Sequence, residues 1–519
     1  MKEYLLSKEE MALYDRNTTE KLGISKEVLI ERAALAVVEY ICDEFTVDNK
    51  RILVAAGFGN NGADGFAIAR ILKEFGFYVE IFSPVQFHEY RADAAKQVYL
   101  CRRYMIDIHE ELPNDNYDIY IDALFGIGLN RDIDDRFAGI INALNRKRGY
   151  KISVDIPSGI DSNTGEVLGT AFMADTTVTF GFYKRGLFLN KGPEYAGTIV
   201  KKYVGINQYS FDDKMPDMFM YLRSADKIDV GRNNFGNKGT FGKVLIIAGR
   251  EDMSGACVLA AKSALRSGCG MVSVITEDAN KAILLAALPE VIIHTYRSED
   301  DIDAIFEEAE HWCDVVAIGP GIGTDRIAIE LLKRCILKSN KPLCIDADAI
   351  NIIARNRMLK ATLLDKQGNA DTFRPVIMTP HIKEFARISG KTVPEVIADG
   401  TSLAKMIAKQ FRAVVVLKDA YSLVVGEDKI YINVYANDAM ATAGSGDVLL
   451  GLLASFMSQY IHNSSIMEAP EADHSQYPFY AAAMTVYVHS LAGLKASEMN
   501  GRSYMIASDI VEKYGEILV

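Results

Sequence analysis

The stretch Arg51-Ile-Leu-Val-Ala-Ala-Gly57-Phe-Gly-Asn-Asn-Gly-Ala-Asp-Gly65 decides how the first half of the chain folds. Its first seven residues predict a buried strand, because a short apolar run ends at a glycine. Residues 63–75 predict the helix that follows this strand. Glycines at such a turn let the backbone approach a ligand closely, and a helix N-terminus attracts phosphate. The same turn is also compatible with a plain connection that binds nothing.

Strand and helix patterns alternate on both sides of this stretch. Further strands are predicted at 78–82, 117–122, 151–155, 243–249, 314–319, 343–346, 376–378 and 413–417. This alternation predicts the α/β class, with βαβ units and mostly parallel sheets. The turn-rich residues 205–238 interrupt the rhythm, so we expect two domains, 1–220 and 225–519. The polar residues 463–477 predict a surface loop.

Composition excludes several classes of function. The 519 residues include 57 Lys and Arg against 69 Asp and Glu, a net charge of −12, so no nucleic-acid or membrane partner is expected. No apolar run approaches the ~20 residues that span a membrane, and the first ten residues lack the apolar stretch of a signal peptide. The seven cysteines contain no CxxC pair, which indicates neither a disulfide framework nor structural zinc. We therefore expect a cytoplasmic protein.

Polar residues and glycines follow three predicted strands of the first half. They lie in the glycine-rich turn after residue 57, in Asp122-Ala-Leu-Phe-Gly-Ile-Gly128 and in Asp155-Ile-Pro-Ser-Gly159. Because ligands bind at the carboxyl ends of parallel strands, we expect these segments to form one site. Oxygen atoms of Asn61, Asp122 and Ser158 could converge on a small cation, although Asn and Ser also satisfy turn amides. Asp155 is either a turn residue or a general acid and base.

The order and spacing of these three segments resemble the NAD(P)H-hydrate epimerase domain, a Rossmann-like three-layer fold. The resemblance implies interconversion of the R and S hydrates of NADH and NADPH (NADHX and NADPHX), with bound potassium held by Asn61, Asp122 and Ser158. We expect Asp155 to be catalytic and to transfer the proton in epimerisation. The residues implied to contact the hydrated dinucleotide are Asn60, Asn61, Gly62, Ala63, Asp64, Gly126, Ile127, Gly128, Leu129, Asn130, Arg131, Asp132 and Asp155. Ala63 stands where the family usually has glycine.

A second glycine-rich turn, Ala443-Gly-Ser-Gly-Asp447, precedes the apolar run Val448-Leu-Leu-Gly-Leu-Leu453 and predicts a loop that leads into a helix. The backbone amides of Gly444, Ser445 and Gly446 would face an anion there. Asp447 is either a favourable partner of the helix dipole or the base that takes a proton from a substrate hydroxyl during phosphoryl transfer.

Other predicted strand ends of the second half also carry polar residues. They are Gly319-Pro-Gly-Ile-Gly323, Asp346-Ala-Asp-Ala-Ile-Asn351, Thr379-Pro-His-Ile-Lys-Glu384 and Lys418. Taken alone, His381 is more often a packed or capping residue than a ligand contact. Lys418 either extends to solvent or meets nucleotide phosphates. Their convergence at one edge of a sheet favours a second site.

With Asn237-Lys-Gly239 and His489-Ser-Leu-Ala-Gly493, this ordered set resembles the ADP/ATP-dependent NAD(P)H-hydrate dehydratases of the ribokinase-like superfamily. The resemblance implies that ADP phosphorylates the S hydrate, with magnesium on the ADP phosphates, and that loss of phosphate restores NAD(P)H. Asp447 would be the base, and Ala256, Gly321, Gly323, His381 and Asp447 would contact the hydrate. Lys418, Asp419, Ala420, Tyr421, Ser422, Gly444, Ser445 and Gly446 would line the nucleotide site. Arg250 and Asp419 replace the family's usual serine and glycine, and family members are commonly homo-oligomeric.

Two alternatives stay open at this point. The chain could be a ribokinase-like small-molecule kinase fused to a Rossmann-like binding module, or its first domain could be a scaffold without catalysis. A kinase accumulates a phosphorylated product, whereas a dehydratase releases phosphate and restores the reduced cofactor.

Overall fold

The computed structural model describes residues 2–46, 50–212, 214–224, 226–231, 234–462 and 476–519. The chain divides into two compact units, Lys2–Phe219 and Met220–Val519, which are called the N-terminal unit and the C-terminal unit below. Most of the loop predicted at 463–477 lies outside the described residues, and helix α16 begins at Tyr477. Within the described ranges, no helix is both long and apolar enough to cross a membrane.

The N-terminal unit contains a seven-stranded sheet in the order β4-β3-β2-β5-β6-β7-β9, in which every neighbouring pair is parallel. Its strands are β2 (Arg51–Ala56), β3 (Tyr78–Phe82), β4 (Ile108–His109), β5 (Ile119–Ala123), β6 (Tyr150–Val154), β7 (Thr176–Phe180) and β9 (Thr198–Lys202). Beside this sheet, β1 (Lys2–Leu6) pairs in parallel with β8 (Tyr183–Lys184). The strand order reverses between β2 and β5, which is where ligands bind in open α/β sheets.

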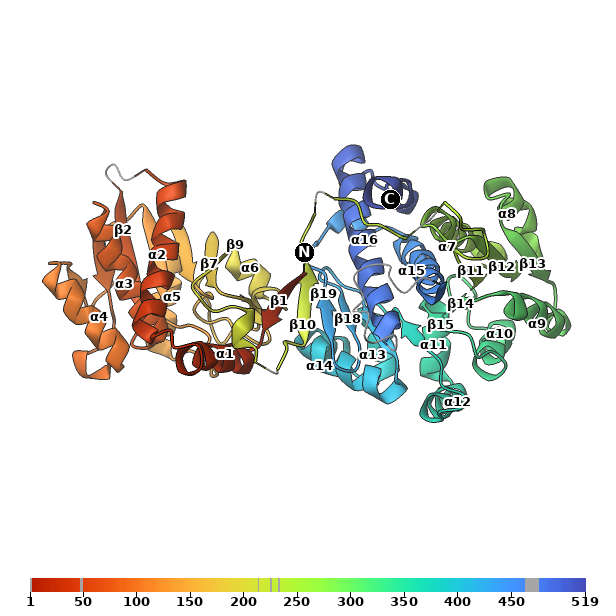
Figure 1. Ribbon diagram of the computed structural model, residues 1–519, viewed down its shortest axis with the longest axis horizontal. Helices are drawn as coiled ribbons and strands as arrows, with labels where there is room; N and C mark the ends of the chain where they lie inside the picture. The colour runs from red at the N-terminus through yellow and green to blue at the C-terminus, as the bar shows by residue number, and fades with distance from the viewer. Residues whose placement is uncertain (1, 47–49, 213, 225, 232–233, 463–475) are drawn as a thin grey trace. The chain divides into compact units, whose positions relative to one another are not determined.

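Helices cover both faces of this sheet (Figure 1). They are α1 (Lys8–Glu20), α2 (Lys26–Glu44), α3 (Asn60–Glu74), α4 (Ala92–Arg103), α5 (Asp135–Arg146) and α6 (Gly192–Ala196). Side chains of β2 alternate between two apolar cores, because successive residues of a strand point to opposite faces. Ile52 and Val54 pack in the core beneath α2, α3 and α4, whereas Leu53 packs in the core beneath α5.

The C-terminal unit contains the strand sequence β13-β12-β11-β14-β15-β16-β17-β18-β19. It is parallel from β13 to β17 and ends in two antiparallel pairings. The strands are β11 (Lys243–Ile247), β12 (Met271–Glu277), β13 (Ile292–Tyr296), β14 (Val315–Ile318), β15 (Leu343–Ile345), β16 (Val376–Met378), β17 (Val414–Leu417), β18 (Leu423–Val425) and β19 (Ile430–Ile432). The short strand β10 (Met218–Tyr221) spans the boundary of the two units.

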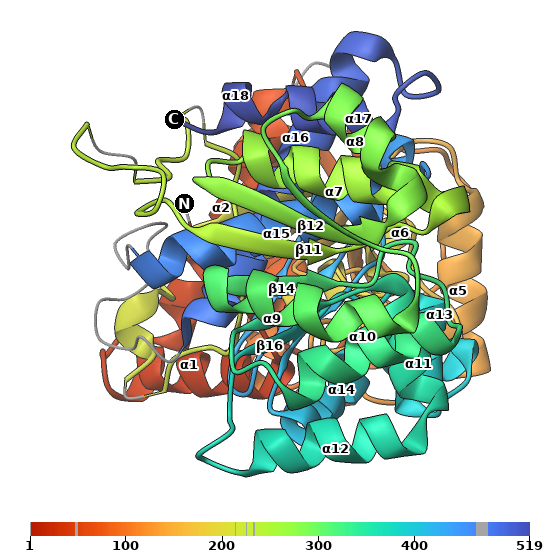
Figure 2. The same cartoon turned by 90° about the vertical axis from the view of Figure 1, so that its right-hand side faces the viewer.

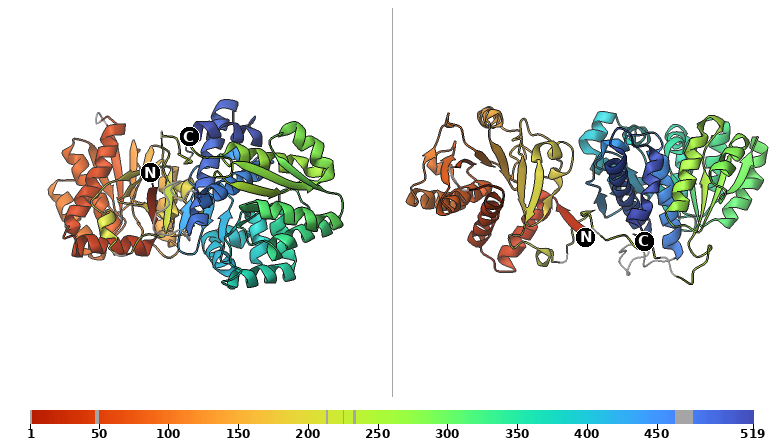
Figure 3. Two further views of the ribbon diagram at one scale, coloured as in Figure 1. Left: turned by 45° about the vertical axis from the view of Figure 1, so that its right-hand side comes forward. Right: turned by 90° about the horizontal axis from the view of Figure 1, so that it is seen from above.

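Helices also flank this second sheet on both faces (Figures 2 and 3). They are α7 (Ser254–Arg266), α8 (Lys281–Ala287), α9 (Ile302–Trp312), α10 (Arg326–Leu337), α11 (Ala347–Arg355), α12 (Arg357–Gly368), α13 (Ile382–Ser389), α14 (Val393–Phe411), α15 (Ser445–His462), α16 (Tyr477–Asn500), α17 (Ala507–Glu512) and α18 (Tyr514–Ile517). Helix α15 packs between α7 and α16 and against β11 and β14. The glycine-rich turn before α15 therefore reaches the carboxyl ends of the central strands.

One helix boundary differs from the expectation. Helix α3 begins at Asn60 rather than at residue 63, so the polar part of the glycine-rich turn is the first turn of the helix. A Cβ atom at Gly62 would lie 1.9 Å from the carbonyl oxygen of Gly57, and one at Gly57 would lie 2.0 Å from that of Leu124. This close backbone packing, which only glycine permits, lets the helix start sooner than the apolar pattern indicates.

Candidate functional site

A cavity of about 610 Å³ lies at the carboxyl ends of β2, β5 and β6 in the N-terminal unit. Eleven of the residues expected to contact a dinucleotide line it: Asn60, Asn61, Asp64, Gly126, Ile127, Gly128, Leu129, Asn130, Arg131, Asp132 and Asp155. Gly62 and Ala63 do not line the cavity: Gly62 packs on the backbone of residue 57, and Ala63 is fully buried in the apolar core. The three segments chosen from the sequence thus meet at one place.

Asp155 lies at the end of β6 with a φ of 68°, a left-handed conformation that is costly for a residue with a side chain. Its Oδ1 atom forms an ion pair with the Lys184 ammonium and accepts hydrogen bonds from Thr179 Oγ1 at 3.2 Å and from the Phe180 amide at 3.1 Å. Burial lowers the pKa of Lys184, and the charge of Asp155 opposes this effect. The result is a carboxylate held in a fixed orientation at the cavity, as proton transfer requires.

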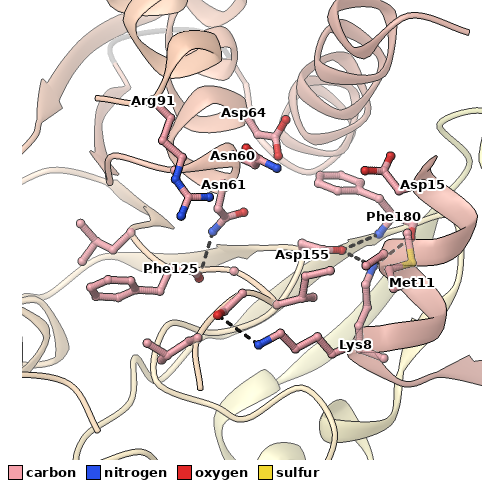
Figure 4. Close-up of a pocket in the computed structure, with 18 of the residues that line it drawn as sticks. Lys8, Met11, Asp15, Asn60, Asn61, Asp64, Arg91, Phe125, Asp155 and Phe180 are labelled. Atoms are coloured by element: carbon pink, nitrogen blue, oxygen red, sulfur yellow. Dashed lines mark hydrogen bonds and ion pairs between the residues drawn. The ribbon is translucent and has the colours of Figure 1, made fainter. Parts of the chain in front are cut away.

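Sequence reasoning missed many of the residues that line this cavity, and two of them, Lys184 and Asp15, bear on its chemistry. Lys184 lines it from β8. Asp15 lines it from α1 (Figure 4). A signal for Lys184 exists, since two basic residues interrupt the otherwise apolar Phe180-Gly-Phe-Tyr-Lys-Arg-Gly-Leu-Phe188. Asp15 gives no such signal, because it is one of several charged residues of an ordinary amphipathic helix.

The three expected potassium ligands also come together, around the peptide of Phe125. Asn61 Nδ2 and Ser158 Oγ donate to the Phe125 carbonyl oxygen at 3.0 and 3.2 Å. The Ser158 hydroxyl and amide lie 2.6 and 2.8 Å from the Asp122 carboxylate oxygens. Burial raises the pKa of Asp122 to about 6, although hydrogen bonds from Ser158 oppose the shift.

This donor set fits a small hard cation. Asp122 is fully buried, and within the described part of the chain it has no basic partner. A cation there would supply the missing positive charge, and amide, hydroxyl, carbonyl and carboxylate oxygens are the ligands that such ions prefer. Clusters of three or more His, Cys, Asp or Glu side chains with metal-binding geometry are absent from the described residues.

Asp447 occupies the first turn of α15 in the C-terminal unit, beside the ends of β15 and β17. Burial raises its pKa to about 7, the charge of Asp346 adds to this shift, and Lys418 opposes it. Lys418 Nζ donates to Asp346 Oδ1 at 2.7 Å. A Cβ atom at Gly446 would lie 3.4 Å from Lys418 Nζ, which places the glycine loop next to the lysine.

The buried His489 donates from Nε2 to the carbonyl of Ser445 at 3.1 Å and so supports the loop.

The glycine cluster of residues 319–323 lies near the start of α7. A Cβ atom at Gly321 would lie 3.1 Å from that of Ala256, and the Gly323 amide donates to Asp348 Oδ2 at 3.0 Å. Arg250 pairs with Asp252 and lies next to Gly323. These residues adjoin a second cavity of about 380 Å³ that Arg250, Glu251, Asp252, Glu277, Tyr296, Ile322, Asp325 and Ile327 line.

His381 is the N-cap of α13, as the capping interpretation expects. Its Nδ1 atom accepts hydrogen bonds from the amides of Lys383 at 3.0 Å and Glu384 at 3.3 Å. Its backbone pairs with that of Lys418, so the histidine lies at the same sheet edge as the glycine loop. Burial and the nearby Lys418 charge lower the pKa of His381, which favours a neutral imidazole.

The segment 419–422 forms a local turn after β17. The Asp419 carboxylate accepts from the amide of Ala420 at 2.8 Å, and Ser422 Oγ donates to the Asp419 carbonyl at 2.9 Å. The Asp419 carboxylate is thus engaged by the turn itself. Tyr421 is half-buried beside it, and burial raises its pKa.

Comparisons with known proteins cover both units. The family described as "YjeF-related protein N-terminus" matches residues 26–186, and the family described as "NAD(P)H-hydrate dehydratase" matches residues 244–515. The bifunctional NAD(P)H-hydrate repair enzyme of Moorella thermoacetica is 31% identical over 98% of this chain and 95% of its own length. The enzyme of the same name from Escherichia coli is 29% identical over 96% of this chain and 90% of its own length. Among solved structures, an ADP/ATP-dependent NAD(P)H-hydrate dehydratase from Bacillus subtilis, co-crystallised with ATP and Mg²⁺, is 26% identical over 55% of this chain and 92% of that chain, with a TM-score of 0.45.

Proposed function

The chain belongs to the family of bifunctional NAD(P)H-hydrate repair enzymes, and from this membership we propose how its residues carry out the two reactions. The enzyme epimerises the R and S hydrates of NADH and NADPH and dehydrates the S form at the expense of ADP. This conclusion rests on the similarity to the enzyme of Moorella thermoacetica, which is 31% identical to this chain. The similar region covers 98% of this chain and 95% of that enzyme, and so includes both domains.

We assign epimerisation to the cavity of the N-terminal unit. The hydrate carries a hydroxyl on the ring carbon next to the nitrogen, and inversion of that carbon requires proton transfer at the hydroxyl. Asp155 performs this transfer, because Lys184 and the Phe180 amide hold one of its oxygens and fix the carboxylate at the cavity. Glycines 126 and 128 and Asn60 line the cavity beside it and bind the dinucleotide.

Asn61, Asp122 and Ser158 are assigned to potassium. When bound, the ion would balance the charge of the buried Asp122 carboxylate and help to attract the dinucleotide phosphates. Asp122 and Ser158 themselves hold the loop of Phe125 and so shape the wall of the cavity.

We assign dehydration to the edge of the C-terminal sheet around Asp447. Hydroxide is a poor leaving group and phosphate is a good one, so the ring hydroxyl is first phosphorylated. Asp447 takes the hydroxyl proton while the terminal phosphoryl group of ADP moves to the oxygen and AMP leaves. The amides of Gly444, Ser445 and Gly446 stabilise charge on the transferred group. The phosphate then leaves with the electron pair of the C–O bond, and loss of a proton from the adjacent ring carbon restores the ring double bond.

Lys418 and its neighbours complete this assignment. The lysine ammonium lies next to the glycine loop and would meet the phosphates of the nucleotide. Magnesium, when bound, would neutralise the ADP phosphates, with Asp346 and Asp348 as nearby oxygen ligands. Ala256, Gly321, Gly323 and His381 would bind the hydrate, and residues 419–422 the nucleotide. A cytoplasmic location and a homo-oligomeric state stay predictions.

Two single substitutions test the division of labour. Asp447→Asn should lower ADP-driven recovery of the 340-nm absorbance by at least about 100-fold and leave R-to-S conversion intact. Asp155→Asn should lower the conversion by a similar factor and leave dehydration of pure S hydrate intact. Asp371→Asn, at an exposed position, is the matched control for the loss of one charge. Normal repair by Asp447→Asn, or accumulation of a phosphorylated product by the wild-type enzyme, would contradict the assignment.

A further inference from the structure

The cavity of the N-terminal unit contains carboxyl groups that are unequally paired. Asp15 from α1, Asp64 from α3 and Asp155 after β6 all line it (Figure 4). Asp155 forms an ion pair with the buried Lys184. Within the described ranges, the carboxyl groups of Asp15 and Asp64 have neither a hydrogen-bond donor nor an ion-pair partner. The other basic residues that line the cavity, Lys8, Lys26, Arg91 and Arg131, form no ion pair with Asp15 or Asp64 in the described ranges. Of the three carboxyl groups, Asp155 is therefore the one with a direct cationic partner.

Inversion of the hydrated carbon needs two proton-transfer groups rather than one. If the oxygen leaves from one face of the ring and water returns to the other, an acid must assist the departure and a base must activate the water. A carboxylate already paired with a lysine is suited to the basic role, whereas an unpaired buried carboxyl is suited to hold the proton.

We propose that Asp64 is the proton donor of the epimerase, that Asp155 is the corresponding base, and that Asp15 keeps Asp64 protonated. This inference rests on the proposed epimerase function of the N-terminal unit. It assigns a catalytic role to Asp64 beyond ligand contact, and it gives Asp15 a positioning role although α1 contains none of the segments that identified the site.

The steps balance as follows. The Asp64 carboxyl gives its proton to the ring hydroxyl, the C–O bond breaks, and water leaves with the electron pair. The lone pair of the ring nitrogen forms a C=N bond, and Asp64 becomes a carboxylate. A second water then adds to the opposite face, its oxygen forms the new C–O bond, the C=N π pair returns to the nitrogen, and Asp155 takes the released proton. The reverse reaction uses the same residues with exchanged roles. Before a second turnover in the same direction, Asp155 releases its proton to solvent and Asp64 takes one up from solvent.

The charges around Asp64 agree with this assignment. Burial raises the pKa of Asp64 well above its usual range, and the charges of Asp155 and Asp15 raise it further, whereas Lys184 opposes them. Asp93 from α4 adds a smaller shift in the same direction. Burial also raises the pKa of Asp15, against the charge of Lys26 from α2. The protonated form of Asp64 is thus favoured, and negative charge on Asp15 and Asp155 at the same cavity would stabilise the cationic ring formed when water leaves.

The first test is a pair of variants measured by R-to-S conversion. Asp64→Asn should reduce the conversion by at least about 100-fold, because the amide cannot donate a proton to the leaving hydroxyl.

In Asp15→Asn, removal of a negative charge lowers the pKa of Asp64, so the alkaline limb of the pH profile of kcat/KM for epimerisation should move to lower pH by about 0.5–1 unit. Glu20→Gln, at the exposed end of the same helix, removes the same charge and should leave the limb unchanged.

The second test uses the wild-type enzyme and does not depend on the folding of a variant. In water enriched in ¹⁸O, each inversion should introduce one labelled oxygen at the ring hydroxyl. Absence of the label, full activity of Asp64→Asn, or an unmoved alkaline limb in Asp15→Asn would overturn the inference while the wild-type enzyme still epimerises. Failure of the wild-type enzyme to epimerise would instead contradict the proposed function itself.

Discussion

Each site places a carboxylate near a lysine, but the two lysines are used differently. Lys184 is paired directly with Asp155, and only 1% of its side chain is exposed. Lys418 is paired with Asp346 rather than with Asp447, and its side chain is 21% exposed. Among the residues that the structure describes, Asp447 has no ion-pair partner, and burial raises its pKa to about 7. The first carboxylate is thus fixed by an ion pair, and the second is poised to change its protonation near neutral pH.

The pH dependence of dehydration follows from this difference. Asp447 acts as a base only when ionised, so kcat/KM for ADP-dependent dehydration should fall as the pH drops through about 7. Stopped assays of released phosphate across the pH range would measure this limb. Epimerisation of the same sample by the other unit provides the internal control, since Asp447 takes no part in it. A dehydration rate that stays constant well below neutral pH would exclude Asp447 as the base.

Asp122 supports a prediction about potassium. A ligand that binds only the folded protein raises its unfolding temperature, so potassium should stabilise the N-terminal unit. In Asp122→Asn the carboxylate charge is lost, and both this stabilisation and the dependence of epimerisation on potassium should disappear. Thermal unfolding with potassium or sodium chloride at equal ionic strength measures the effect. Equal unfolding temperatures of the wild-type protein in the two salts would refute the assigned site.

At the scale of elements, the predicted strands were those with continuous apolar runs. The strands of the sequence-based prediction coincide within two residues with β2, β3, β5, β6, β11, β14, β15, β16 and β17, because both faces of a parallel sheet are covered by helices. The strand β7, Thr-Thr-Val-Thr-Phe, was missed because its buried threonines resemble a polar segment. The pair β18 and β19 was missed as well, since each strand has only three residues.

The candidate site residues likewise divide into those that the sequence pattern locates and those that it does not. Residues that follow a strand could be placed from the sequence alone, because strand ends converge at one edge of a parallel sheet. Lys184 was missed although two basic residues interrupt an otherwise apolar segment there. Asp15 could not be placed, since it reaches the cavity only through the packing of α1. Tertiary packing of this kind leaves no pattern of spacing in the sequence.

The two expected roles of His381 can be separated at the start of α13. His381→Ala removes the acceptor for two backbone amides and should destabilise the protein by about 1 kcal/mol. His381→Asn retains an acceptor of the kind favoured at N-caps and should leave stability nearly unchanged. If His381 also binds the hydrate, KM for the S hydrate should rise in both variants. Urea unfolding and steady-state kinetics measure the two effects, and an unaltered KM in both variants would leave His381 as a cap alone.

At the scale of the whole molecule, the described residues assigned to each candidate site belong to a single unit. All the described residues that line the 610 Å³ cavity belong to the N-terminal unit. Asp447, Lys418, Asp346 and the glycine loops all belong to the C-terminal unit. The hydrate must therefore leave one site and enter the other, and nothing in either site requires both to belong to the same chain.

This arrangement predicts complementation between chains. A sample of R hydrate treated with Asp155→Asn alone or with Asp447→Asn alone should not recover NADH faster than spontaneous epimerisation allows. An equimolar mixture of the two variants should restore repair, because the S hydrate made by the intact N-terminal unit of one chain can diffuse to the intact C-terminal unit of another. The increase in absorbance at 340 nm in the presence of ADP measures the recovery, and the wild-type enzyme at the same concentration of each site sets the full rate. A mixture that repairs no faster than either variant would mean that the hydrate passes between the sites of a single chain without release.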